Sequence, residues 1–150
     1  MNALGRCLIA SLLFGMAATA APDTAHADEV VLLLNKRNPT KKIPRGKVVS
    51  MFLGNTAFWH GVVPVKLVVR GAKTDAGTAF YEPVVQMTGA RYEAYWTSRQ
   101  LAGQGVKPES ADTITRVVEF LKKNPGAISF ALASEVEGQD LAGVKVVPLP

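Results

Sequence analysis

The segment from Arg70 to Thr78 joins an apolar run to a stretch with helical spacing. It contains a guanidinium at Arg70 and a carboxylate at Asp75. Gly77 and Thr78 stand at the start of the stretch with helical spacing. A helix start presents unpaired N–H groups with partial positive charge, glycine lets backbone approach a ligand, and arginine can donate to two oxygens at once. Such a loop suits a small oxyanion. It equally suits an ordinary strand-to-helix turn in which Thr78 or Asp75 caps the helix.

Groups for covalent, acid–base or metal chemistry are sparse. Cys7 is the single cysteine, and His60 is the single histidine after residue 27. After residue 27 a Ser-His-Asp triad would have to use His60, and no set of His and Cys residues is available to bind a metal. No two acidic residues have the spacing typical of a general acid and base pair. We therefore expect no enzymatic activity, no catalytic residue, no metal and no cofactor.

The first residues have the features of an export signal. Arg6 precedes the apolar run 7–21, which is shorter than the roughly 20 residues that cross a bilayer core. Ala25-His26-Ala27 fits a signal-peptidase site, with Ala18-Thr19-Ala20 as the other candidate. We expect residues 1–27 to be a cleaved signal peptide, residues 28–150 to form one periplasmic domain, and the chain to have no stable membrane span.

Charge favours anionic partners. The chain contains 17 Lys and Arg and 12 Asp and Glu, for a net charge of +5, and removal of the leader leaves this value unchanged because Arg6 and Asp23 cancel. Basic residues are dense between 36 and 47, namely Lys36, Arg37, Lys41, Lys42, Arg45 and Lys47. An ordinary solvated face explains such a cluster, and so does attraction to anions or to a membrane surface. An export signal argues against nucleic acid as the partner.

Hydrophobic spacing predicts alternating strands and helices. Strands are expected at Val30–Leu34, Val62–Val69, Ala127–Ala133 and Val144–Leu149, and helices over residues 44–54, 78–87, 88–103 and 110–124. Pro83 disturbs the second helix. This alternation predicts an α/β domain, with a mainly parallel sheet of about four to five strands and helices on both faces.

Four stretches in this order resemble the substrate-binding proteins of phosphate-type ABC transporters. They are Asn35-Lys-Arg-Asn-Pro39, Met51-Phe-Leu-Gly54 followed by Trp59 and Gly61, Arg70 through Thr78 with Phe80, and Asn124-Pro-Gly-Ala-Ile-Ser-Phe130. The resemblance implies a three-layer lobe of the type II periplasmic-binding-protein kind. It also implies anion-binding roles for Arg70, Asp75, Gly77 and Thr78. Full-length members have two lobes, so this chain resembles a short single-lobe member.

Two departures weaken the implied phosphate site. Ala76 stands where the family has a serine, which removes one hydroxyl donor, and the family's first-lobe binding loop has no counterpart in this sequence. Two functions therefore compete. One is a solute-binding module that takes a small oxyanion such as phosphate for an ABC transporter permease or a sensor protein. The other is an accessory or regulatory periplasmic protein that binds a protein or envelope partner and has lost solute binding. We expect a monomer or a weak homodimer, and two copies could also pair to rebuild a cleft.

Overall fold

The computed structural model describes residues 28–150. The predicted signal peptide lies outside the described residues. The first half of the described chain contains β1 (Val30–Asn35), α1 (Arg45–Phe52), β2 (Phe58–Trp59), β3 (Val63–Pro64), β4 (Lys66–Val69), α2 (Asp75–Phe80) and the π-helical turn η1 (Tyr81–Val85). The second half contains α3 (Gly89–Leu101), β5 (Glu109–Ser110), α4 (Ile114–Lys123), β6 (Ala127–Leu132), α5 (Ala133–Val136) and β7 (Val144–Pro148).

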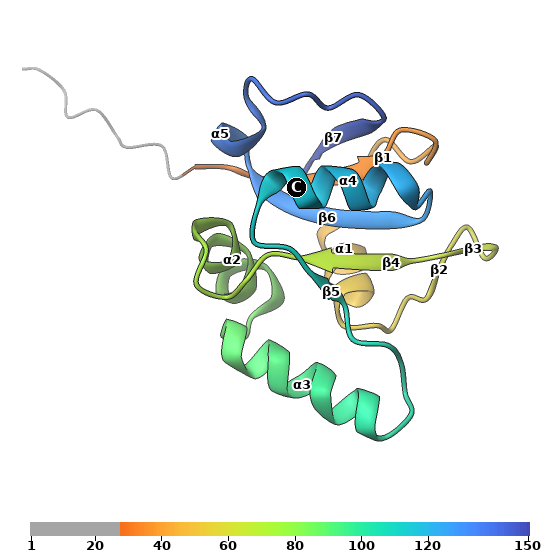
Figure 1. Ribbon diagram of the computed structural model, residues 1–150. Helices are drawn as coiled ribbons and strands as arrows, with labels where there is room; N and C mark the ends of the chain where they lie inside the picture. The colour runs from red at the N-terminus through yellow and green to blue at the C-terminus, as the bar shows by residue number, and fades with distance from the viewer. Residues whose placement is uncertain (1–27) are drawn as a thin grey trace, which may run out of the picture.

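The main sheet has five strands in the order β5-β4-β6-β1-β7 (Figure 1). β4 pairs in parallel with β5 and β6, whereas β1 pairs antiparallel with β6 and β7. Four strands thus run in one direction and β1 runs against them. The predicted mainly parallel sheet is confirmed. The reversal of β1 escaped prediction because its partners β6 and β7 lie at the far end of the chain.

Helices cover both faces of this sheet, as predicted. In Figure 1 α4 lies in front of β6 and α1 lies behind the sheet. Val117 and Leu121 of α4 pack with Leu33 of β1 in one core cluster. The next strand residue, Leu34, belongs to the cluster on the opposite face. Since successive strand residues point to opposite faces, the unbroken apolar run of β1 is what a strand covered on both sides requires.

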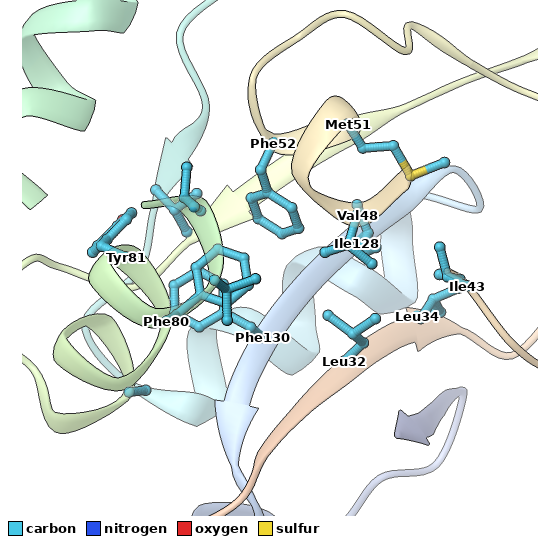
Figure 2. Packing of buried hydrophobic residues seen from close by; sticks show 14 of the residues in the cluster. Leu32, Leu34, Ile43, Val48, Met51, Phe52, Phe80, Tyr81, Ile128 and Phe130 are labelled. Carbon is cyan, nitrogen blue, oxygen red and sulfur yellow. The ribbon is translucent and has the colours of Figure 1, made fainter. Parts of the chain in front are cut away.

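The larger core, on the face away from α4, is built around three phenylalanines. Phe80 of α2 stacks on Phe130 of β6 with ring centroids 3.8 Å apart and planes at 9°. Phe52 of α1 meets the Phe80 ring edge-on at 4.8 Å. Figure 2 shows these rings beside Ile128 and Leu32, which extend the same cluster along the sheet. This packing holds α1 and the end of α2 against the sheet.

The predicted strand Val62–Val69 is divided in two. β3 pairs with β2 in a separate two-stranded hairpin, and only β4 enters the main sheet. His60 and Gly61 have φ values of 47° and 81°, and the N–H of Val62 donates to the carbonyl of Trp59 at 3.0 Å. Positive φ at both central residues is the requirement of a type I′ hairpin turn. The hairpin could not be predicted from the sequence, because the two residues of β2 are too few to show an alternating pattern.

The predicted disturbance at Pro83 is confirmed and has a distinct form. α2 passes directly into η1, and Pro83 lies inside this π-helical turn. Proline lacks an N–H and its ring clashes with the preceding turn of an α-helix, whereas the wider π turn accommodates it. The carbonyl of Pro83 accepts a bond from Nη2 of Arg45 at 2.5 Å.

Candidate functional site

The candidate site lies where the parallel strands β4, β5 and β6 end together. Arg70 follows β4, Asp112 lies just beyond β5, and Glu135 lies in α5 just beyond β6. The parallel pairings of β4 with β5 and with β6 bring these three positions to one edge of the sheet. In open α/β sheets this carboxyl edge is where ligands bind.

Arg70 is buried at this edge and already has an anionic partner within the chain. Its Nη2 and Nη1 atoms donate to Oε1 and Oε2 of Glu135 at 2.7 and 3.0 Å. Nη2 also donates to the backbone carbonyl of Asp112 at 3.0 Å. The side chains of Arg70 and Glu135 are 4% and 26% exposed. The guanidinium therefore forms a bidentate ion pair that is largely shielded from water, and bidentate pairs are among the strongest charged hydrogen bonds.

Glu135 is held in place independently of Arg70. Its Oε2 also accepts the backbone N–H of Leu132 at 3.0 Å, so the carboxylate closes the first turn of α5. Glu135 was not singled out from the sequence, because no two acidic residues have a spacing that argues for acid–base work. The available signal was its position three residues after the last apolar residue of a strand, the spacing of a capping box.

The turn before α2 is closed by Thr74. Oγ1 of Thr74 accepts the N–H of Gly77 at 3.0 Å and donates to the carbonyl of Gly71 at 2.8 Å. The N–H of Thr78 donates to the carbonyl of Thr74 at 2.9 Å. The helix cap is therefore Thr74, and the expected cap at Thr78 or Asp75 was wrong. Two of the N–H groups considered for an oxyanion are bonded inside the turn.

Gly77 is needed for close packing within the turn. A Cβ atom at this position would lie 2.2 Å from the carbonyl oxygen of Gly71. Gly77 thus lets α2 approach the loop that leads into it. In this structure the close backbone approach that glycine permits is made to Gly71.

The four predicted anion-binding residues share one strand-to-helix connection but do not converge. Arg70 and Gly77 are buried, whereas the side chains of Asp75 and Thr78 are exposed. Nε of Arg70 is buried and has no hydrogen-bond partner in the described part of the chain. The N–H on this atom is therefore a donor of the Arg70 side chain that could still take an added acceptor.

A small cavity of about 190 Å³ borders Arg70 and Gly71 and is walled by aromatic rings. Tyr81 donates its hydroxyl to the carbonyl of Arg70 at 2.7 Å, and Tyr92 donates to that of Phe52 at 2.7 Å. Burial raises the pKa of both phenols above the ordinary value of 10.0. The hydroxyl groups of both rings are thus bonded within the fold, which indicates that these tyrosines are packing residues.

Two general features of the described chain bear on its class. Within residues 28–150 no group of three or more His, Cys, Asp or Glu side chains lies close enough together to hold a metal ion. In the same residues no helix has the length and apolar character needed to cross a membrane.

Comparison with solved structures identifies the fold. The chain superposes on an ABC-type phosphate transport receptor from Vibrio cholerae with a TM-score of 0.52 and 17% sequence identity, covering 80% of this chain and 45% of the receptor. It superposes on PstS from Borrelia burgdorferi with a TM-score of 0.61 and 9% identity, covering 81% of this chain and 47% of PstS. No protein-family model and no curated protein sequence matches the chain.

These similarities confirm the predicted structural resemblance to phosphate-type receptors. The chain has a periplasmic-binding-protein fold and spans less than half the length of the two receptors. At this level of sequence identity the likeness concerns the fold.

Proposed function

We propose that this chain is an accessory or regulatory periplasmic lobe of a phosphate-type ABC transport system, and that it acts through a partner. The proposal starts from the fold, which is that of part of a phosphate receptor. The described residues match less than half of each receptor, so the role proposed here is one that does not require a closed solute site.

The observation that carries the proposal is the pairing of Arg70 with Glu135. Phosphate at this arginine would have to share or replace a carboxylate already bonded to both terminal nitrogens, with Nη2 also bonded to the carbonyl of Asp112. Replacing the carboxylate would leave Glu135 without its cation and beside a second anion, which is costly. The loss of the serine hydroxyl at Ala76 acts in the same direction.

A second candidate function is binding of a small oxyanion such as phosphate by Arg70, Asp75, Gly77 and Thr78 for a transporter permease or sensor. The buried, unpartnered Nε of Arg70 favours it, since an added acceptor would satisfy that atom. The exposed hydroxyl of Thr78 could add a further donor. Asp75 would oppose a fully charged anion unless the ligand brought a proton to share with its carboxylate.

Calorimetric titration of residues 28–150 with phosphate and with sulfate separates the two candidates. The accessory function predicts no heat with the unaltered protein. It predicts weak phosphate binding in Glu135→Gln, because the amide has nearly the same shape but no negative charge and so frees the guanidinium. Glu137→Gln, an exposed acid of the same segment, is the matched control.

Heat with the unaltered protein that disappears in Arg70→Lys would establish the oxyanion function and overturn the accessory one. Lysine keeps the positive charge but cannot form the bidentate hydrogen bonds of a guanidinium. This variant therefore tests whether the anion binds at Arg70. The mass in solution, measured with and without phosphate, shows whether two copies of the chain associate around the anion.

A further inference from the structure

A second surface of distinct chemistry lies at the opposite end of the sheet from Arg70. β1 runs antiparallel to β6, so the end of β1 lies beside the starts of β6 and β7. Bases collect at this end, and we call the group the basic edge: Lys36, Arg37, Lys41, Lys66, Lys122 and Lys145. In Figure 1 the loop after β1, the β2–β3 hairpin and the end of α4 lie together at the right of the molecule.

Contacts between distant segments hold the basic edge together. Nζ of Lys145 donates to the carbonyls of Asn38 and Thr40. Oγ1 of Thr40 lies 3.2 Å from Nε2 of His60, which ties the same loop to the hairpin. A hollow of about 300 Å³ is lined by Lys36, Arg37 and Lys122 together with Asn35 and Gly143.

Acidic residues compensate little of this charge. Within residues 28–150 the salt bridge at this edge joins Lys122 to Asp140 at 3.9 Å, and Asp140 is 81% exposed. The pKa of Lys145 is lowered, first by burial and second by the positive charge of Lys41. The second cause shows that Lys41 and Lys145 lie close enough for their charges to interact.

The hairpin adds exposed apolar groups beside these bases. Phe58, Val62 and Val63 are 51%, 77% and 40% exposed, although each is large and hydrophobic. They are held by a short hairpin whose Trp59 is buried and donates its indole N–H to the carbonyl of Gly126 at 2.9 Å. The hairpin is thus fixed to the domain by Trp59 while its other apolar side chains face solvent. Core packing does not explain why these side chains are exposed.

An apolar hollow joins the hairpin to the basic loop. It measures about 340 Å³ and is lined by Pro39, Trp59, Val62, Val63 and Pro125, with Arg37 and His60 also bordering it. Apolar groups at a protruding tip, with cations around them, match the two layers of a lipid interface, where phosphates lie outside acyl chains.

We propose that the basic edge and the β2–β3 hairpin dock on an anionic phospholipid surface. Phe58 and Val62 enter the boundary between headgroups and acyl chains, while Arg37 and Lys36 lie against lipid phosphates. The turn that contains Arg70 then faces away from the membrane. The inference does not depend on whether that turn binds an anion, because the two surfaces lie at opposite ends of the sheet.

Co-sedimentation of residues 28–150 with vesicles tests this proposal. Binding is expected to vesicles of phosphatidylcholine with phosphatidylglycerol, at least about tenfold above binding to pure phosphatidylcholine, and to fall at high ionic strength. Val62→Asp combined with Phe58→Ser should abolish binding. Leu101→Ser combined with Val106→Ser should not, although these residues are 86% and 85% exposed.

A matched pair of charge variants tests the electrostatic part. Lys36→Gln with Arg37→Gln should reduce binding about tenfold or more, whereas Lys73→Gln with Arg91→Gln removes the same charge elsewhere and should have little effect. Thermal unfolding checks that each variant remains folded. Equal losses from both charge pairs would show attraction by net charge alone and overturn the proposal.

Two other occupants would be revealed by the same measurements. If inorganic phosphate at constant ionic strength displaces the protein from vesicles, the edge binds free phosphate and the lipid proposal is wrong. If the protein ignores anionic vesicles but binds an acidic peptide such as polyglutamate, and Val62→Asp with Phe58→Ser prevents this, the occupant is an acidic protein surface and the lipid proposal is likewise wrong.

Discussion

The carboxylate of Glu135 faces the guanidinium of Arg70 with two bonds of 2.7 and 3.0 Å, and both residues lie at the carboxyl edge of the sheet. The bond pair links the end of β4 to the start of α5. It places a buried cation and its counter-ion at the position where α/β sheets commonly receive a ligand. The same contact thus bears on stability and on ligand binding.

Removing one member of this pair should destabilise the domain. Glu135→Ala leaves the buried guanidinium unpaired and also removes the acceptor for the N–H of Leu132. We expect a loss of about 2–3 kcal/mol in the free energy of unfolding, below the largest values for buried pairs because Glu135 is 26% exposed. Urea denaturation measures it.

The double variant Arg70→Met with Glu135→Leu provides the control for this prediction. It should recover part of the lost stability, since neither charge remains buried. A double variant that is less stable than Glu135→Ala alone would contradict this account of the pair.

Gly77 should tolerate no side chain. In Gly77→Ala the new Cβ would lie 2.2 Å from the carbonyl oxygen of Gly71, so the loop or α2 must shift, and we expect a loss of about 2 kcal/mol or more. Gly46→Ala is the matched control, because no atom lies within 4 Å of a Cβ there and alanine favours the helical backbone of α1. It should stabilise the domain by roughly 0.5–1 kcal/mol. Equal effects at the two positions would refute the packing role of Gly77.

Phe80 should be the most sensitive position of the aromatic core. It stacks on Phe130 and meets Phe52 edge-on (Figure 2). Phe80→Ala opens a cavity where α2 meets the sheet and should cost about 3–5 kcal/mol. Phe58→Ala removes an equal volume from a half-exposed ring and should cost well under half of that. Thermal or urea unfolding of the two variants gives the comparison.

Alkaline pH should weaken the fold through the buried tyrosines. Burial raises the pKa of Tyr81 and Tyr92 above the ordinary 10.0, so above pH 10 the unfolded chain releases phenolic protons that the folded chain retains. The free energy of unfolding should therefore fall by up to about 1.4 kcal/mol per pH unit for each such group.

Tyr92→Phe isolates one of these two contributions. The variant loses the bond to Phe52 and about 1 kcal/mol at neutral pH, but its stability should fall less steeply above pH 10. Comparison with the unaltered protein cancels the contribution of the lysines. Parallel slopes for the two proteins would show that Tyr92 does not cause the alkaline loss.

Local sequence signals determined most of the elements. The unbroken apolar run of β1 requires cover on both faces, and the spacing of Val117, Val118 and Leu121 requires cover on one face of α4. Each requirement can be read from one segment of the sequence. The α/β class and the helices on both faces followed from these periods alone. The candidate loop with Arg70, Gly77 and Thr78 was indicated by its resemblance to phosphate-type receptors rather than by these periods.

Tertiary structure alone decided what those elements do together. The reversal of β1, the partner of Arg70 and the gathering of Lys36, Lys122 and Lys145 at one edge each depend on the pairing of segments far apart in the chain. A residue's type and its neighbours in sequence carry no information on which distant group it will meet. The sequence thus determined that the chain carries many cations and one candidate turn. Strand order and register decided that Arg70 pairs with Glu135 and that Lys36, Arg37 and Lys122 gather at the other edge.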